Sequence, residues 1–348
     1  MEFELIKEQI VHLNSKFEKQ QVIDFLEKQN LSLDKGVEYT VALVDGDKMI
    51  GTGSFEGRIL KCIAVDAQYQ NRGLSNKIIT HLVNEQYCRG NTHLFLYTKP
   101  ENEFMFSQLG FYEISRVPSK VILMENKLGG LKQYLTEISY HKQRGENVAS
   151  IVVNCNPFTL GHLYLVEYAA SRSDHVHLFV VWEDQSVFPA EVRYKLVKEG
   201  VKHLSNVTVH KGKDYIISNA TFPSYFIKEY QDVVETHAAL DLRIFGQHIA
   251  PVMGINKRYA GEEPYCAVTR TYNQKMKEIL PQYGIEVVQV PRMTVESNAI
   301  SASRVRKYLR EGEFEKIKVL VPKTTYSFLC SQEALEIIER IRASSQRH

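Results

Sequence analysis

The stretch from residue 150 to residue 170 limits most strongly what this chain can fold into. It starts with the β-branched run Ile151-Val152-Val153, passes through a polar turn containing Pro157, and reads Thr159-Leu160-Gly161-His162 before an apolar segment with helical spacing. The pattern predicts a buried strand, a sharp turn and a helix that begins beside Gly161. Because the first amides of a helix lack backbone partners and carry the positive end of its dipole, such a start suits an anion.

A second segment near the end of the chain reads Ile300-Ser301-Ala302-Ser303-Arg304-Val305-Arg306. Ser301 or Ser303 can cap a helix that ends at Gly312. Arg306 lies three residues after Ser303, so its guanidinium shares a helix face with the hydroxyl and can add charge to a bound anion. Two helix starts of this kind, one opening and one closing a βα domain, suit a triphosphate held between them.

Together, Thr159-x-Gly161-His162 and Ile300-Ser301-x-Ser303-x-x-Arg306 resemble the paired signature of the HxGH nucleotidyltransferase superfamily. Further segments narrow the resemblance to the citrate lyase ligase family, over nearly the whole chain. These segments are Phe245-Gly246-Gln247-His248-Ile249-Ala250-Pro251, Asn256-Lys257-Arg258-Tyr259-Ala260-Gly261-Glu262-Glu263-Pro264 and Thr269-Arg270-Thr271-Tyr272-Asn273.

Composition excludes several classes of function. A chain of 348 residues suits two domains, and its net charge of +2 provides no general field for polyanions, so no nucleic acid partner is expected. Five cysteines without a C-x-x-C pair are typical of reduced thiols in a cytosol. The N-terminus lacks the apolar core of a signal peptide, and no apolar run is long enough to cross a bilayer. We therefore expect a cytoplasmic protein with no membrane partner.

Residues 1–128 are expected to form an α+β domain with a helix over 15–30, a hairpin over 39–55, and strands over 58–65 and 93–98. The segment Gln70-Asn71-Arg72-Gly73-Leu74-Ser75 opens a helix between the last two strands. This order resembles the GNAT acetyltransferase fold, and Gln70-x-x-Gly73-x-Ser75 resembles its pyrophosphate loop, with serine at the last position. The resemblance implies that Gln70, Arg72, Gly73 and Ser75 bind coenzyme A or a similar carrier arm. Alternatively, Gly73 only makes a turn in a domain that has lost activity. No acidic base for acetyl transfer is obvious.

A linker is expected over 129–146 and a second domain over 147–348. Strands are expected over 151–153, 176–181, 207–210, 242–245 and 286–290, alternating with helices over 163–171, 190–203, 222–237 and 269–280. This alternation predicts a Rossmann-like, doubly wound parallel sheet. The fold class is therefore α/β, with a GNAT-like α+β domain followed by a nucleotidyltransferase-like domain.

The ATP site is expected at the carboxyl ends of the parallel strands. The residues expected to bind ATP are Asn154, Asn156, Pro157, Phe158, Gly161, His162, Gly246, Ile300, Ser301, Ser303 and Arg306. The expected catalytic residues are His162, Thr159 and Arg306, with His162 stabilising charge on the α-phosphate and the leaving pyrophosphate. Taken separately, His162 and Ser301 would be interpreted as residues of ordinary helix starts. Only the presence of both motifs in one chain favours a role in nucleotide binding.

Further candidates for acid or phosphate contacts are Arg193, Lys211, Lys213 and His248. Arg193 can also be read as a solvated surface side chain. His175-x-His177 shares a strand face without a third ligand nearby, so no metal site is expected.

The family resemblance implies an acid-thiol ligase. It implies that ATP adenylates acetate, that the thiol of the CoA-like prosthetic group on the citrate lyase acyl carrier subunit takes the acetyl group, and that Mg²⁺ is bound through the phosphates. Three alternatives stay open: a nucleotidyltransferase acting on a phosphorylated small molecule, an acetyl-CoA-dependent acetyltransferase with a regulatory nucleotide-binding domain, and a nucleotide sensor without turnover.

Overall fold

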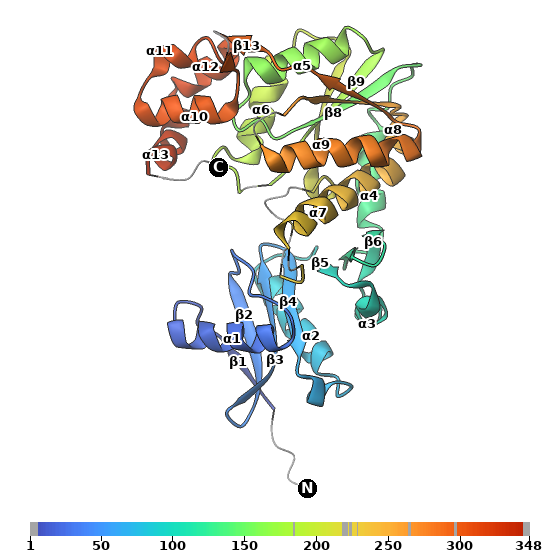
Figure 1. Ribbon diagram of the computed structural model, residues 1–348, viewed down its shortest axis with the longest axis vertical. Coiled ribbons are helices and arrows are strands. Elements are labelled where there is room, and N and C mark those ends of the chain that lie inside the picture. The colour runs from blue at the N-terminus through green and yellow to red at the C-terminus, as the bar shows by residue number, and fades with distance from the viewer. Residues whose placement is uncertain are drawn as a thin grey trace. The chain divides into compact units, whose positions relative to one another are not determined.

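The computed structural model describes residues 6–183, 185–217, 222, 225–227, 229–263, 266–295 and 298–343. The chain divides into two compact units (Figure 1). The first comprises Met1–Leu131 and Pro223–Thr236, and the second comprises Lys132–Phe222 and His237–His348. Residues 223–236 lie between second-unit segments in the sequence but group with the first unit, an excursion that the sequence pattern does not indicate.

The first unit is built on a seven-stranded sheet in the order β1-β2-β3-β4-β5-β7-β6. Its strands are β1 (Lys7–Ile10), β2 (Tyr39–Asp45), β3 (Lys48–Glu56), β4 (Ile59–Val65), β5 (Phe95–Thr98), β6 (Tyr112–Val117) and β7 (Val121–Glu125). All neighbours are antiparallel except β4 and β5, which run parallel and pair only at Ile59 with Phe95 and Leu60 with Leu96. The ladder between β4 and β5 is therefore short.

Helices cover both faces of this sheet. Helix α1 (Lys16–Lys28) buries Val22, Phe25 and Leu26 on one face, and α2 (Leu74–Cys88) buries Ile78 and Leu82 in a separate cluster. Because successive strand residues point to opposite faces, Val41 joins the α2 cluster and Ala42 the α1 cluster. The shorter elements are η1 (Ala67–Tyr69), η2 (Pro100–Asn102) and α3 (Glu103–Gln108).

The second unit contains a five-stranded parallel sheet in the order β10-β9-β8-β11-β12. Its strands are β8 (Val148–Val153), β9 (His175–Val180), β10 (Val207–Lys211), β11 (Lys257–Gly261) and β12 (Glu286–Val290). The helices among them are α4 (Gly130–Ser139), α5 (Leu160–Ala170), α6 (Ala190–Gly200), η3 (Lys213–Tyr215), α7 (Tyr230–Ile244) and α9 (Ala267–Ile279) followed by η5 (Leu280–Tyr283). The first residues of α4, up to Leu131, and those of α7, up to Thr236, group with the first unit. The predicted α/β class and parallel sheet are confirmed.

The C-terminal part adds a helical group beside the sheet (Figure 1). It contains α10 (Ala302–Glu311), α11 (Phe314–Ile317), α12 (Lys323–Leu329), η6 (Gln332–Ala334) and α13 (Leu335–Ala343), preceded by the short strands β13 (Thr294–Val295) and β14 (Asn298–Ala299). Helix α10 is capped by Ser301 and ends at Gly312 with φ of 77°, as its sequence predicts.

The predicted strand over 242–245 is wrong. Helix α7 continues through this region into a π-helical turn, η4 (Phe245–Ile249), and then α8 (Ala250–Met253). A short apolar run fits a buried helix face as well as a strand. The sheet strand that the sequence pattern did not indicate is β11. It begins with two charged residues, Lys257 and Arg258, which do not suggest a buried strand. In the structure Arg258 is nevertheless buried, with its guanidinium 4.4 Å from the ring centroid of Phe245.

Candidate active site of the second unit

Helix α5 begins directly after β8 and is capped by Thr159. The Thr159 hydroxyl accepts a hydrogen bond from the His162 amide at 3.4 Å, while the Thr159 amide donates to Nδ1 of His162 at 3.0 Å. This reciprocal arrangement is a capping box in which histidine occupies the place usually taken by glutamate. It fixes the orientation of the imidazole at the helix start.

The same hydrogen bonds define the tautomer of His162. Because Nδ1 accepts from the Thr159 amide, the neutral ring carries its proton on Nε2. Burial and, to a smaller extent, the positive charge of Arg292 lower the pKa of His162 to about 4. His162 is therefore neutral at pH 7 and presents an Nε2–H donor.

Helix α10 provides a second start of the same kind. The Ser301 hydroxyl accepts from the Arg304 amide at 3.3 Å and lies 3.1 Å from the Ser303 hydroxyl. Within the described residues, the amides of Gly161 in α5 and of Ala302 and Ser303 in α10 have no hydrogen-bond partner. Both helix starts thus retain amides that can bind an anion.

The two helix starts meet. A Cβ atom on Gly161 would lie 3.4 Å from the carbonyl oxygen of Ile300, so the α5 start packs directly on the segment that leads into α10. From the other side, Nη1 of Arg306 donates to the carbonyl oxygen of Asn156, which is 150 residues away in the sequence. The geometric condition for binding one triphosphate at both motifs is therefore met.

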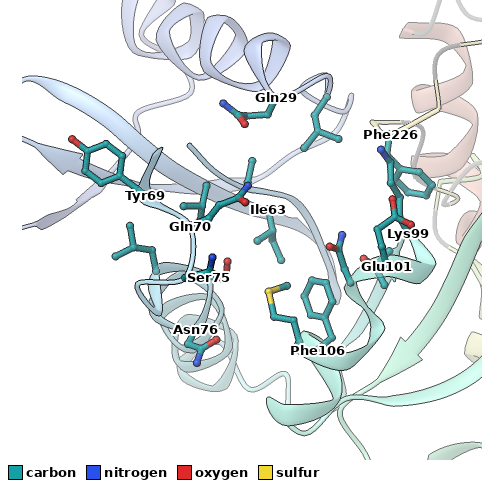
Figure 2. Close-up of a pocket in the computed structure, with 18 of the residues that line it drawn as sticks. Gln29, Ile63, Tyr69, Gln70, Ser75, Asn76, Lys99, Glu101, Phe106 and Phe226 are labelled. Carbon is teal, nitrogen blue, oxygen red and sulfur yellow. The ribbon is translucent and has the colours of Figure 1, made fainter. Parts of the chain in front are cut away.

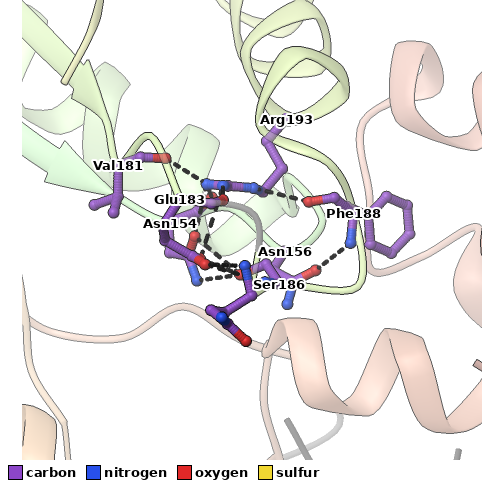
Figure 3. Close-up of polar contacts among 8 residues, drawn as sticks. Asn154, Asn156, Val181, Glu183, Ser186, Phe188 and Arg193 are labelled. Carbon is purple, nitrogen blue, oxygen red and sulfur yellow. Dashed lines mark hydrogen bonds and ion pairs between the residues drawn. The ribbon is translucent and has the colours of Figure 1, made fainter. Parts of the chain in front are cut away.

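Arg193 organises the turn between β8 and α5, a role that sequence reasoning did not assign to it. Its side chain is fully buried and donates to the carbonyl oxygens of Val181 at 2.6 Å, Asn154 at 3.0 Å and Phe188 at 2.9 Å, and also to that of Glu183 (Figure 3). Neither a surface position nor a direct ligand contact, the two roles considered for Arg193, describes this environment.

The same guanidinium holds the side chain of Asn154. Nη1 of Arg193 donates to Oδ1 of Asn154 at 2.7 Å, which leaves the Nδ2 group oriented toward Ser186 at 3.1 Å (Figure 3). Asn154 is exposed at the end of β8, whereas the side chain of Asn156 is buried and accepts from the Phe188 amide at 3.1 Å. Of the two asparagines, Asn154 is therefore the one placed to meet a ligand.

Three of the residues expected at the ATP site are buried. Phe158 is fully buried and stacks on the His162 ring with centroids 5.9 Å apart, and Pro157 and Ile300 are also buried. A Cβ atom on Gly200 would lie 2.4 Å from the Phe158 ring, so α6 closes against this aromatic side chain. The Phe158 ring, itself enclosed by α6, therefore packs against the imidazole.

The structure does not bring the remaining candidates into this group. Gly246 is buried in η4, where a Cβ atom would lie 2.4 Å from the ring of Tyr283, at the amino end of β12. His248 belongs to the same π-helical turn. Both positions therefore lie away from the carboxyl ends of the strands, because they were assigned to a strand end that does not exist.

Lys211 and Lys213 are held by neighbouring acids. Lys211 ends β10, pairs with Glu191 at 2.6 Å and lies 4.4 Å from the ring centroid of Trp182. Lys213 pairs with Glu137 at 2.5 Å.

Sequence reasoning missed Arg292. This arginine follows the carboxyl end of β12, its Nε donates to the carbonyl oxygen of Glu262 at 2.7 Å, and it pairs with Glu263. Its positive charge contributes to the lowered pKa of His162. The only available signal was an arginine two residues beyond a predicted strand end.

The first unit contains a separate pocket of about 600 Å³ between the start of α2 and the β4–β5 region (Figure 2). Its lining includes Gln70, Gly73 and Ser75 of the predicted pyrophosphate loop, whereas Arg72 lies beside it with its guanidinium 4.9 Å from the Tyr69 ring centroid. The backbone amides of residues 70–76 have no hydrogen-bond partner within the described part of the chain.

Comparison with known proteins identifies the chain. A family model described as "Citrate lyase ligase C-terminal domain" matches residues 148–329. Citrate (pro-3S)-lyase ligase from Klebsiella pneumoniae is 41% identical over 329 residues, which cover 93% of this chain and 96% of that protein. The chain belongs to the citrate lyase ligase family. The family resemblance inferred from the sequence is thereby confirmed.

Two further relatives extend this result. The citrate (pro-3S)-lyase ligase of Escherichia coli is 40% identical to this family member over 332 residues, or 94% of each chain. A phosphopantetheine adenylyltransferase from Staphylococcus saprophyticus is 40% identical over 57 residues, which cover 16% of this chain and 35% of that protein.

In the described residues no three His, Cys, Asp or Glu side chains gather in a way that would hold a metal ion. No helix in the same residues has the length and apolar character needed to span a membrane.

Proposed function

We propose that this citrate lyase ligase family member uses ATP to activate acetate and transfers the acetyl group to the thiol of the CoA-like prosthetic group on the acyl carrier subunit of citrate lyase. The observation that carries the proposal is the meeting of the α5 and α10 starts, joined by Arg306 and Asn156, in a chain whose relatives over almost its full length are citrate lyase ligases.

In the first half-reaction the acetate oxygen attacks the α-phosphate and pyrophosphate leaves. The neutral His162 donates its Nε2 hydrogen to a phosphate oxygen where negative charge grows. The open amides of Gly161, Ala302 and Ser303 and the charge of Arg306 hold the phosphates in line. No side-chain nucleophile is needed, because the site acts by positioning and charge stabilisation.

Mg²⁺ belongs to the substrate in this proposal. The described residues have no carboxylate cluster for it, so the ion enters on the phosphates of ATP and neutralises part of their charge.

In the second half-reaction the carrier thiol attacks the acetyl carbon and AMP leaves. The pocket of the first unit binds the prosthetic arm. This placement is supported by the pocket itself and by the open amides of residues 70–76, which suit the phosphates of a CoA-like group.

The decisive experiment is isotope exchange between pyrophosphate and ATP, measured with a panel of short carboxylic acids. Acetate-dependent exchange is the expected result. Exchange that depends instead on a mononucleotide or phosphopantetheine would overturn the proposal in favour of a nucleotidyltransferase. Consumption of acetyl-CoA without any exchange would indicate an acetyltransferase, and tight ATP binding without either reaction would indicate a sensor.

A further inference from the structure

Two aromatic residues, Tyr225 and Phe226, complete the pocket of the first unit, although in the sequence they lie within the second half of the chain. Both line the pocket, and both belong to the excursion that groups with the first unit. Figure 2 shows Phe226 beside Lys99 and Glu101, across the pocket from Tyr69 and Gln70. The two rings contact each other edge to face, with centroids 4.9 Å apart.

Tyr225 is anchored at the point where β4 and β5 part. The last pair in that short ladder is Leu60 with Leu96, and the Tyr225 hydroxyl donates to the carbonyl oxygen of the next residue, Tyr97, at 2.9 Å. The carbonyl of Tyr225 accepts from the Ser32 amide at 2.9 Å. Its position is therefore fixed by the first unit, independently of any ligand.

Burial reinforces this anchoring. Tyr225 is only 9% exposed and packs with Phe25 and Leu26 of α1. Burial raises the pKa of the Tyr225 hydroxyl well above its ordinary value, so the hydroxyl remains a donor at all physiological pH values. Phe226 packs more loosely against the same cluster and is partly exposed, which leaves its ring accessible from the pocket.

The chemistry of the pocket changes from one side to the other. On the side of residues 70–76 it offers unpartnered amides at the start of a long helix, and on the other side it offers the rings of Phe106, Tyr225 and Phe226. Glu101 is the one carboxylate among the described lining residues. A ligand with phosphate at one end and a slender, largely apolar chain at the other matches this distribution.

We propose that Tyr225 and Phe226 form the wall against which the thiol-bearing half of a phosphopantetheine-type arm packs, and that they thereby determine the affinity of the first unit for the carrier. This inference rests on the proposed function for the identity of the arm. It goes beyond that function by assigning the arm's distal contacts to a chain segment outside the GNAT-like region of the sequence.

The test uses the full-length protein, with coenzyme A as the probe in titration calorimetry. Phe226→Ala should raise the Kd for coenzyme A about tenfold, as expected when an aromatic pocket contact is removed. Tyr225→Phe, which removes only the hydroxyl that holds the wall to Tyr97, should raise it about fivefold. Phe17→Ala and Tyr140→Phe are matched controls, because both side chains are highly exposed, at 73% and 81%, and neither lines the pocket.

Two further measurements separate the possible outcomes. Acetate-dependent pyrophosphate exchange should stay within about twofold of wild type in both variants, whereas the KM for the carrier subunit should rise in parallel with the Kd. Unchanged coenzyme A affinity in Tyr225→Phe and Phe226→Ala proteins with native melting curves would overturn the inference. The inference would also be overturned if the wild-type protein exchanged pyrophosphate but did not bind coenzyme A. In that case the proposed adenylation of acetate would still be supported. Loss of exchange in the wild type would instead refute the proposed function.

Discussion

The starts of α5 and α2 show two ways of presenting backbone amides to phosphate. At α5, Thr159 caps the helix and orients His162, so one imidazole N–H is held in place. At α2, Gly73 occupies the cap position with φ of 73° and provides no side-chain hydrogen bond, which leaves a run of amides open. The capped start suits charge stabilisation in a transition state, and the uncapped one suits binding of a ligand that does not react there.

The strongest test of this comparison is His162→Ala. We expect pyrophosphate exchange to slow by about 10²- to 10³-fold, the range typical of a lost charge-stabilising donor. The Kd for ATP and the Kd for coenzyme A should change far less, because the donor acts mainly on developing charge. Steady-state exchange kinetics and calorimetry measure these quantities. Near-normal turnover would remove His162 from the mechanism and erase the distinction between the two starts.

Replacement of Arg193, which holds the turn before α5, should lower the stability of the protein. Arg193→Met leaves several buried carbonyl oxygens without their donor and should lower the free energy of unfolding by about 3 kcal/mol. Urea titration followed by tryptophan fluorescence reports this effect in the second unit, because Trp182 is the single tryptophan of the chain.

The matched control for this variant is Lys195→Met, on the same helix and 60% exposed. It should change the free energy of unfolding by less than about 0.5 kcal/mol. An equally small effect of Arg193→Met would show that the buried hydrogen bonds of Arg193 do not support the site.

Acid should weaken the second unit through two hydrogen-bonded histidines. Nδ1 of His177 and Nε2 of His210 lie 3.0 Å apart, and burial together with neighbouring histidines lowers the pKa of each to about 3. Because these folded-state values lie below the unfolded value of about 6.5, the unfolded state binds more protons, and stability falls as the pH drops from about 6.5 toward 3.

Urea midpoints measured by Trp182 fluorescence between pH 7 and pH 4.5 test this prediction. A stability that stays constant over this interval would contradict the assigned titration of the His177–His210 pair.

The smallest expected effect concerns the uncapped start. Gly73→Ala introduces a Cβ at a left-handed position and should cost about 1 kcal/mol of stability while raising the Kd for coenzyme A about fivefold. Gly90→Ala, at the other end of the same helix with φ of 84°, should cost a similar amount of stability without any change in this Kd. Equal effects of both variants on coenzyme A would mean that the α2 start is not a binding element.

Much of the second unit was predictable because local patterns specify it. The run Ile151-Val152-Val153 and the Thr159 cap mark a strand and a helix start within a few residues of each other, and both occur where expected. Ser301 and Gly312 bound α10 for the same reason. The meeting of these two starts could be inferred only by treating them as one signature, and the structure bears out that inference through the contact of Arg306 with Asn156.

Two buried arginines explain most of the differences between the sequence-based predictions and the structure. Arg258 made β11 look like a polar loop, and Arg193 read as a surface or ligand-binding residue. In both cases the charge is buried: the Arg258 guanidinium lies over the ring of Phe245, and the Arg193 guanidinium donates to carbonyl oxygens of Asn154, Val181 and Phe188. A sequence window cannot reveal such partners.

The amino-acid sequence by itself determined the family, the α/β class and the two helix starts, because strand runs, caps and turn glycines act over a few neighbouring residues. Only the tertiary structure decided that Arg193 holds Asn154, that β11 is a sheet strand, and that Tyr225 and Phe226 complete the pocket of the first unit. These features depend on burial and on contacts between segments more than a hundred residues apart in some cases, such as Tyr225 with Tyr97, which chain folding alone brings together.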